Sequence, residues 1–325
     1  MTLKRRTLAA GLTAGLAMAS LPIGAWAQAY PSRTIKLIAG FAAGGPADGI
    51  ARSIAKALED ELKQPVVVEN KAGAAGVIGL DALTNSPPDG YTIGLLANTT
   101  TNALHFQGKT LDADARFTPV GKFVSTRIVL VVNPDLVPAK TLPEFIDFLR
   151  RNPETTLTSA GHGGLGHLGL ELFAQDQKLK IVHVAYRGSA PAMQDVVAGQ
   201  VAGMVVDASS AMSNIQAGRL RVLATVSSMR TPSLPDVPTA LELGIKSLQI
   251  DSSMGIVLPP KTPKPIVDRM RAALKAAVNS PFYTDVANKA GNAHFFDDAD
   301  KFKAWLQEDF DRSGKIIRTA NIKPQ

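Results

Sequence analysis

The residues best suited to bind a ligand lie in a glycine turn near the start of the sequence. Gly44, Gly45 and Pro46 follow an apolar segment at 34–38 and precede a predicted helix, which has apolar residues four apart on one face at 50, 54, 58 and 62. Glycine lets the backbone approach a ligand closely because it has no Cβ, and Pro46 suits the first position of a helix. The carboxylate of Asp48 can accept hydrogen bonds from the free N–H groups of that helix. A strand, a glycine turn and a helix N-terminus together favour the binding of a small anion, although such a turn can also be purely structural.

A second glycine loop lies in the middle of the chain. Gly161, Gly163 and Gly166 follow a strand-like segment and precede a helix-like one, so they match the spacing of the dinucleotide-binding fingerprint. The acidic residue expected about twenty positions later is missing, and Tyr186 and Arg187 stand there instead. Arg187 could in principle meet a 2′-phosphate, but an exported protein has little access to nicotinamide cofactors. We therefore expect no cofactor.

Histidine chemistry offers one alternative function. His162 and the glycines after it resemble an esterase oxyanion loop, but the chain has no G-x-S-x-G nucleophile motif. His162 and His167 are the only close pair among five histidines, and neither has a carboxylate or thiol at metal-ligand spacing. We expect no metal site. His162 can still donate to a carboxylate or titrate near neutral pH, and a solvent-facing loop histidine is the plain alternative. An exported enzyme with His162 as base stays a rival hypothesis, as does a ligand-sensing receptor.

Apolar strands alternate with helices along most of the chain, and Gly, Ser or Thr residues occupy the junctions. This pattern predicts α/β architecture with parallel sheets and ligands at the carboxyl ends of the strands. Residues 98–101 read as a polar loop. Thr141, with Glu144 three residues later, and Ser189 read as helix N-caps, and two helices, starting near Pro263 and Asp298, end the chain. Strands are expected at 34–38, 65–70, 91–97, 127–133, 156–160, 180–186, 201–206, 220–227 and 252–258. No flexible linker is visible, so 127–133 and 252–258 are the candidate crossings between two domains.

Composition and the N-terminus indicate an exported protein. Residues 1–27 combine a basic start, an apolar run and the small-x-small site that ends at Ala27, which predicts a signal peptide cleaved there, by the general or the twin-arginine route. The chain of 325 residues carries a net charge of +7, and removing Lys4, Arg5 and Arg6 leaves +7 − 3 = +4. The remaining charges are scattered, which argues against a nucleic-acid partner. There is no cysteine, so stability must come from burial.

Several motifs, in this order, resemble the extracytoplasmic solute receptors of tripartite tricarboxylate transporters, the Bug family. They cover the whole chain after the leader: 30–35 (YPSRTI), 41–48 (FAAGGPAD), 66–76 (VVVENKAGAAG), 88–92 (PDGYT), 159–161 (SAG), 182–191 (VHVAYRGSAP), 199–201 (GQV) and 234–239 (LPDVPT). The resemblance implies a non-enzymatic periplasmic binding protein. Its two α/β lobes have mostly parallel sheets, are joined by hinge strands and close over the ligand. The lobes would comprise 28–128 with 254–325, and 129–253.

The resemblance also implies a ligand, partners and site residues. The ligand would be a small organic carboxylate, namely a di- or tricarboxylate, an amino acid or an aromatic acid, which a monomeric receptor hands to membrane subunits of the transporter. Asp207 would accept from a ligand amine or hydroxyl, repel a second carboxylate, or only cap the next helix. Segments 105–109 and 162–166 depart from the family pattern beside the expected pocket. The ligand contacts carried over by position are Phe41, Ala43, Gly44, Gly45, Asn98, Thr99, Ser159, Gly161, His162, Gly163, Gly188, Ser189 and Asp207.

Overall fold

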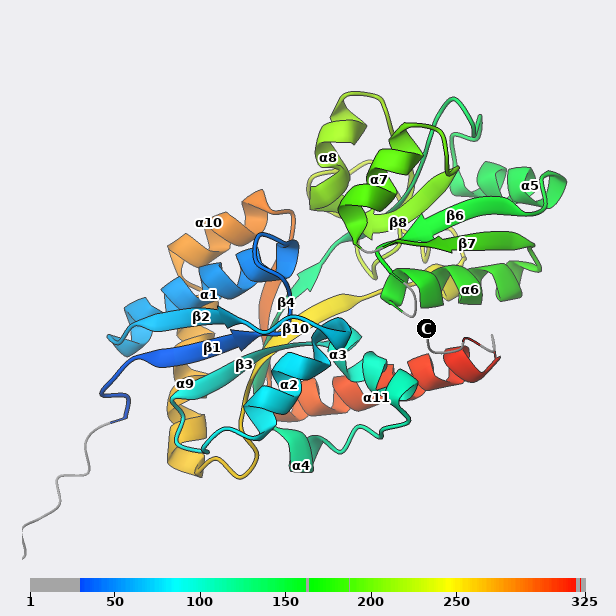
Figure 1. Ribbon diagram of the computed structural model, residues 1–325. Coiled ribbons are helices and arrows are strands. Elements are labelled where there is room, and N and C mark those ends of the chain that lie inside the picture. The colour runs from blue at the N-terminus through cyan, green and yellow to red at the C-terminus, as the bar shows by residue number, and fades with distance from the viewer. Residues whose placement is uncertain (1–29, 162–163, 187, 320–321, 323–325) are drawn as a thin grey trace, which may run out of the picture.

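The computed structural model describes residues 30–161, 164–186, 188–319 and 322. Two α/β lobes lie side by side, each built around one sheet (Figure 1). The first sheet has the order β11-β4-β10-β3-β1-β2 and the second the order β7-β6-β8-β5-β9. The strands of the first are β1 (Ile35–Ala39), β2 (Val66–Asn70), β3 (Thr92–Ala97), β4 (Thr118–Thr126), β10 (Ser252–Leu258) and β11 (Ala293–Asp298). Those of the second are β5 (Ile128–Val132), β6 (Thr155–Ser159), β7 (Ile181–Ala185), β8 (Gly203–Asp207) and β9 (Arg221–Thr225).

Helices cover both faces of each sheet. The first lobe carries α1 (Pro46–Leu62), α2 (Val77–Thr84), α3 (Asn98–Ala103), α4 (Ala113–Arg116), α9 (Lys264–Val278), α10 (Pro281–Lys289) and α11 (Ala299–Thr319). The second carries α5 (Leu142–Arg151), α6 (Leu165–Gln177), α7 (Ser189–Val197) and α8 (Ala208–Gln216). Short 3₁₀ turns lie at Ala74–Gly76, Leu104–Gln107 and Lys246–Leu248. In the described part of the chain, no helix has both the length and the apolarity to cross a membrane.

The two-lobe α/β fold is confirmed, but both sheets are mixed rather than mostly parallel. Strands β1, β2 and β3 run parallel to one another, as do β6, β7 and β8. In contrast, β10 pairs antiparallel with β3 and β4, and β5 pairs antiparallel with β8 and β9. The chain passes directly from β4 into β5 and returns into β10, without the helical crossover that makes neighbouring strands parallel. Strands β5 and β10, which enter a sheet from a crossing, therefore run against the parallel set, whereas β4 and β9, which lead out to a crossing, run with it.

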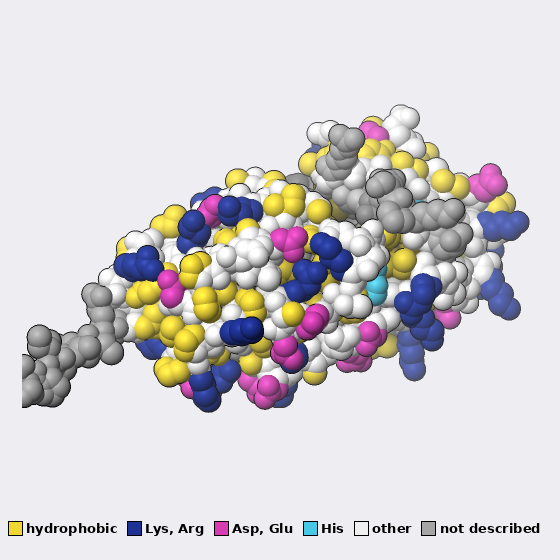
Figure 2. Space-filling model, turned by 60° about the horizontal axis from the view of Figure 1, so that its bottom comes forward, with side chains coloured by type: hydrophobic (Ala, Val, Ile, Leu, Met, Phe, Trp, Pro, Cys, Tyr) yellow, Lys and Arg dark blue, Asp and Glu magenta, His cyan; other side chains and the backbone are white. Residues whose placement is uncertain are grey.

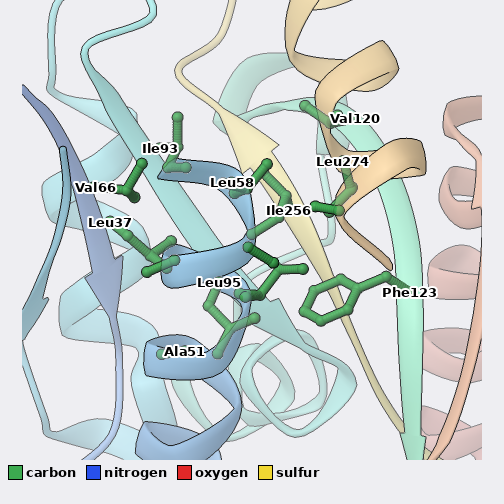
Figure 3. Packing of buried hydrophobic residues seen from close by; sticks show 14 of the residues in the cluster. Leu37, Ala51, Leu58, Val66, Ile93, Leu95, Val120, Phe123, Ile256 and Leu274 are labelled. Carbon is green, nitrogen blue, oxygen red and sulfur yellow. The ribbon is translucent and has the colours of Figure 1, made fainter. Parts of the chain in front are cut away.

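The hydrophobic core of the first lobe explains the position of α1. The four-residue apolar repeat predicted for this helix is confirmed, because Ile50, Ile54, Leu58 and Leu62 are all buried. This stripe packs on the first sheet with α9 beside it (Figure 3). The sheet contributes Leu37, Ile93, Leu95, Phe123 and Ile256 to the same cluster. Burial of this stripe fixes the rotation of α1, and with it the place of the glycine turn that precedes the helix.

Several local predictions need correction. The predicted polar loop at 98–101 is instead the first turn of α3, whose buried polar side chains bond to other elements. Gly188, not Ser189, occupies the N-cap position of α7. The chain end holds α10 and β11 in addition to the two predicted helices, and β4 had no predicted counterpart. Strand β4 lies between β11 and β10, and most of its residues are buried. Because both of its faces are covered, apolar and polar residues do not alternate clearly along it, and the sequence gives little sign of a strand.

The crossing that returns to the first lobe is anchored by polar contacts. The chain leaves the first sheet across Arg127 and returns to it through Asp251. The amide of Asn98 donates to the carbonyl of Asp251 over 2.9 Å, and the N–H of Ser253 donates to Asn98 Oδ1 over 3.3 Å. Asn98 also donates to the buried carboxylate of Asp309 on α11, over 2.9 Å. The lobe limits drawn from the sequence remain a prediction.

Candidate functional site

A large cleft lies between the two lobes. It consists of two adjoining hollows that share Phe41, Ala160 and Ser189. The first has a volume of about 670 Å³ and lies between the ends of β1–β3 and those of β6 and β8. The second has a volume of about 840 Å³ and lies between the start of α1 and the helices α7 and α8. Both lobes therefore contribute to a single interlobe cleft.

The carboxyl ends of parallel strands supply much of the cleft wall. In the first lobe, Phe41 follows β1, Ala74 and Ala75 follow β2, and Thr99 follows β3. In the second lobe, Ser159 ends β6 and Asp207 ends β8. Ligands of open α/β sheets bind outside these strand ends because the connecting loops leave a crevice there. The sheets thus direct both sets of loops toward the same space.

Hydrogen bonds to the carboxylate of Asp48 stabilise the glycine turn before α1. Its Oδ2 accepts the N–H of Gly44 at 2.9 Å and Arg52 Nε at 2.8 Å, and its Oδ1 accepts Asn70 Nδ2 at 2.8 Å. Asn70 also donates to the carbonyl of Phe41 over 3.0 Å. The hydrogen bonds from Arg52, Gly44 and Asn70 outweigh desolvation and lower the pKa of Asp48 to about 2. This network orders the turn, but it also occupies the N–H of Gly44, which is therefore not free for a ligand.

Helix N-termini give the cleft its electrostatic character. Helix α1 begins after Gly45, α6 after Gly164 and α7 after Gly188, and all three glycines line the cleft. The first turn of a helix has N–H groups without intrahelical partners and carries a partial positive charge. Among the described residues that line the first hollow, none is Lys or Arg, and Asp207 is the one carboxylic acid. An anion in this hollow would be held mainly by backbone donors and hydroxyl groups.

Ser159 brings a hydroxyl group of the second lobe to the wall of the first hollow. Its Oγ lies 3.2 Å from the carbonyl of Gly161 and 2.9 Å from Nε2 of His183. The N-terminus of α6 packs closely against Ser159, as the space at Gly166 shows: a Cβ on this glycine would lie only 2.8 Å from the Cβ of Ser159. Only glycine at position 166 lets the helix N-terminus approach the strand end this closely.

Asp207 lies at the N-cap position of α8, yet its side chain makes no capping hydrogen bond. Burial raises the pKa of this carboxyl group, and the Thr126 hydroxyl and the backbone N–H of Asp207 oppose the shift only in part. The neutral form is therefore favoured over a wider pH range than for an exposed aspartate. A neutral carboxyl group can donate to a ligand oxygen, so the expected repulsion of a second carboxylate is weakened.

The structure places most of the predicted contacts along the cleft, although their role as ligand contacts stays a prediction. Phe41, Thr99, Ser159, Gly161, Ser189 and Asp207 line the first hollow, and Gly44, Gly45 and Gly188 line the second. Asn98 is a correction: it is fully buried, and its amide anchors a lobe crossing. Ala43 lines neither hollow. His162 and Gly163 lie outside the described residues.

Several other residues that line the cleft were not predicted from the sequence. Ala74 and Ala75 face the first hollow with positive φ angles of 47° and 52°, and the Gly-Ala-Ala-Gly run around them was a usable signal. Phe106 and Gln107 line the same hollow, and they belong to the segment 105–109 that departs from the family pattern. Glu171 lies four residues after His167 and pairs with it, so the expectation that this histidine has no carboxylate at such spacing was wrong. Among the described residues, no group of three or more His, Asp or Glu side chains could hold a metal ion.

Comparison with known proteins identifies the family. Residues 50–322 match the tripartite tricarboxylate transporter family receptor. Protein BugT of Bordetella pertussis is 31% identical over 318 residues, which cover 96% of this chain and 95% of that protein. The periplasmic binding protein BugD is 29% identical, with a TM-score of 0.78 over 91% of this chain and 100% of that chain.

Two similar structures contain carboxylates. MatC of Rhodopseudomonas palustris with bound malate is 27% identical and has a TM-score of 0.74 over 89% of this chain and 100% of that chain. A second R. palustris protein, with adipate, is 27% identical and has a TM-score of 0.79 over 91% of this chain and 100% of that chain. The family is one of solute-binding receptors rather than enzymes. On the match across most of its length, this chain belongs to the tripartite tricarboxylate transporter receptor family.

Proposed function

We propose that this protein is a periplasmic receptor that captures a small organic carboxylate in the interlobe cleft and delivers it to the membrane subunits of a tripartite tricarboxylate-type transporter. The observation that carries the proposal is the wall of the first hollow, where helix N-termini and hydroxyls converge without a described Lys or Arg. Export is supported by the signal-like residues 1–27. The malate and adipate bound to two similar proteins support a dicarboxylate among the possible ligands.

The energetics of the cleft are compatible with useful affinity. A hydrogen bond from a backbone N–H to a carboxylate contributes roughly 1.5–3 kcal/mol. Two or three such bonds from each lobe can give useful affinity after the cost of ordering a small ligand is subtracted. On the face shown in Figure 2, basic and acidic side chains are interspersed. The backbone donors and hydroxyl groups of the cleft make it a suitable site for a small carboxylate.

The first test is ligand identification. Native mass spectrometry of protein isolated from the periplasm, followed by mild denaturation, should release a stoichiometric small carboxylate. Isothermal titration with malate, adipate, a tricarboxylate, an amino acid and an aromatic acid should then rank the ligand classes. Absence of binding across this panel, together with protein that carries no acid from the periplasm, would refute the proposal.

A matched pair of variants locates the binding site. Ala160 is exposed and lines both hollows, so Ala160→Trp fills the cleft without disturbing the core. Ala276→Trp adds the same side chain at an exposed position on α9, which lines neither hollow. Ala160→Trp should abolish binding, whereas Ala276→Trp should bind like the wild type. Delivery is tested separately, by measuring uptake of the identified acid in cells with and without the receptor gene.

A further inference from the structure

Two stacked histidines lie behind the cleft wall of the second lobe. His183 on β7 and His167 on α6 have ring centroids 3.9 Å apart and planes within 12° of each other. His167 is buried, and its Nε2 lies 3.6 Å from Oε1 of Glu171, one turn along the same helix. A hydrogen bond with His167 lowers the pKa of Glu171, and charge on His167 and His183 adds to this effect. The His183 ring thus packs against His167, which is in turn paired with Glu171.

His183 connects this buried group to the cleft residue Ser159. Its hydroxyl carries one proton and lies near two partners, Gly161 O at 3.2 Å and His183 Nε2 at 2.9 Å. A carbonyl can only accept a hydrogen bond, so the contact with Gly161 requires the serine proton. Both contacts are satisfied together only if Nε2 of His183 carries a proton and donates it to Ser159 Oγ.

We propose that His183 is a positioning residue for ligand binding, which holds Ser159 as a hydrogen-bond donor toward a ligand carboxylate. This inference rests on the proposed function. While Nε2–H of His183 donates to Oγ, the serine proton cannot turn toward the imidazole. It can rotate only between Gly161 O and the cleft, which Ser159 lines. The 3.2 Å contact with the neutral carbonyl is long, and a carboxylate offers the stronger, charge-assisted bond.

The tautomer of His183 gives a test that needs no ligand. Nitrogen-15 NMR of the histidine side chains in the full-length protein should show a protonated Nε2 on His183. Its resonance should shift in Ser159→Ala, because the acceptor of that N–H is removed. An unprotonated, acceptor-type Nε2 at neutral pH would overturn the inference, whatever the ligand of the protein is.

Binding variants test the consequence for the ligand, with adipate and malate as probes. The amide nitrogen of glutamine can occupy the position of Nε2. The side chain of asparagine is shorter by one methylene, so its amide nitrogen cannot reach that position. His183→Gln should therefore keep adipate or malate affinity within about threefold, and His183→Asn and His183→Phe should weaken it about ten- to a hundredfold. His294 lies on β11, at the edge of the first sheet, and lines neither hollow, so His294→Phe is the matched control and should bind normally.

The outcomes separate this inference from the proposed function. Equal affinity of wild type, His183→Gln, His183→Asn and His183→Phe would overturn the positioning role while leaving a carboxylate receptor intact. A wild type that binds no acid would refute the proposed function, and the tautomer measurement would still decide the role of His183. Circular dichroism melting of each variant distinguishes loss of folding from loss of the hydrogen bond, and the Gln and Asn variants keep a polar side chain of similar size.

Discussion

Replacing Asp48 by asparagine tests how the glycine turn before α1 is held. The wild-type carboxylate accepts from the Gly44 N–H, from Arg52 and from Asn70. Asparagine has the same shape but loses the charge and one of the two acceptor oxygens. Its amide group must then face a donor, because all three partners donate to the wild-type carboxylate. We expect the variant to fold with a weakened turn.

The expected cost follows from the pKa of Asp48. Hydrogen bonds lower it from its ordinary value of 3.8 to about 2. At about 1.4 kcal/mol for each pKa unit, the interactions of the ionised form contribute roughly 2 kcal/mol at neutral pH. Because the folded pKa is depressed, this contribution is fully present above about pH 4 and is lost as the pH falls toward 2. Asp48→Asn removes it at every pH.

The assay is urea denaturation of wild type and Asp48→Asn between pH 2 and 7. The difference in unfolding free energy should be roughly 2 kcal/mol at pH 7 and should shrink steadily below pH 4. Asp60→Asn, which removes an exposed carboxylate paired with Lys56 on the same helix, is the control and should have a much smaller effect. A difference between wild type and Asp48→Asn that does not change with pH would refute the electrostatic reasoning.

Three further predictions concern the cleft and the crossings. Asn98→Ala should lower the unfolding free energy by about 2–3 kcal/mol in urea titrations, because it leaves the buried carboxylate of Asp309 short of a donor; an unchanged midpoint would contradict its anchoring role. Gly166→Ala should weaken carboxylate binding about tenfold by calorimetry, since the new Cβ displaces Ser159; normal affinity would mean that the helix yields instead. Asp207→Asn should raise the melting temperature at pH 7: the folded-state pKa of Asp207 is raised, so wild-type stability falls as the pH rises from 3.8 toward that higher value. Equal melting temperatures of the two proteins from pH 4 to 8 would contradict this.

Much of the fold was predictable because it depends on residues near one another in the chain. The apolar repeat of α1, Pro46 at its start and the capping of α5 by Thr141 are all local patterns, and each is present as predicted. Thr141 accepts the N–H of Glu144, three residues ahead. Such patterns fix the type of an element and its buried face, and the strand-to-helix alternation then indicates which loops lie at the carboxyl ends of parallel strands.

Elements around the crossings between the lobes were harder to predict. The antiparallel strands β4 and β11 pair through partners distant in sequence, such as Ser125 with Ala293. The sequence around β4 gives no sign that this strand pairs with β11, which follows α10 much later in the chain. The mixed character of the sheets depends on where the chain crosses between the lobes, and that is a property of the whole topology.

The sequence alone determined the class of this protein: an exported-type α/β chain with glycine turns suited to anions, and a family pattern of receptors. Only the tertiary structure decided which side chain of each loop faces the cleft. Asn98 and Thr99 are neighbours at the end of β3, yet Thr99 lines the cleft and Asn98 is buried on Asp251 and Asp309. The contact between Ser159 and His183 likewise needs β6 and β7 to pair in one register. The direction of a side chain at a strand end depends on packing against elements that are distant in the chain. The neighbouring residues in the sequence do not indicate which elements these are.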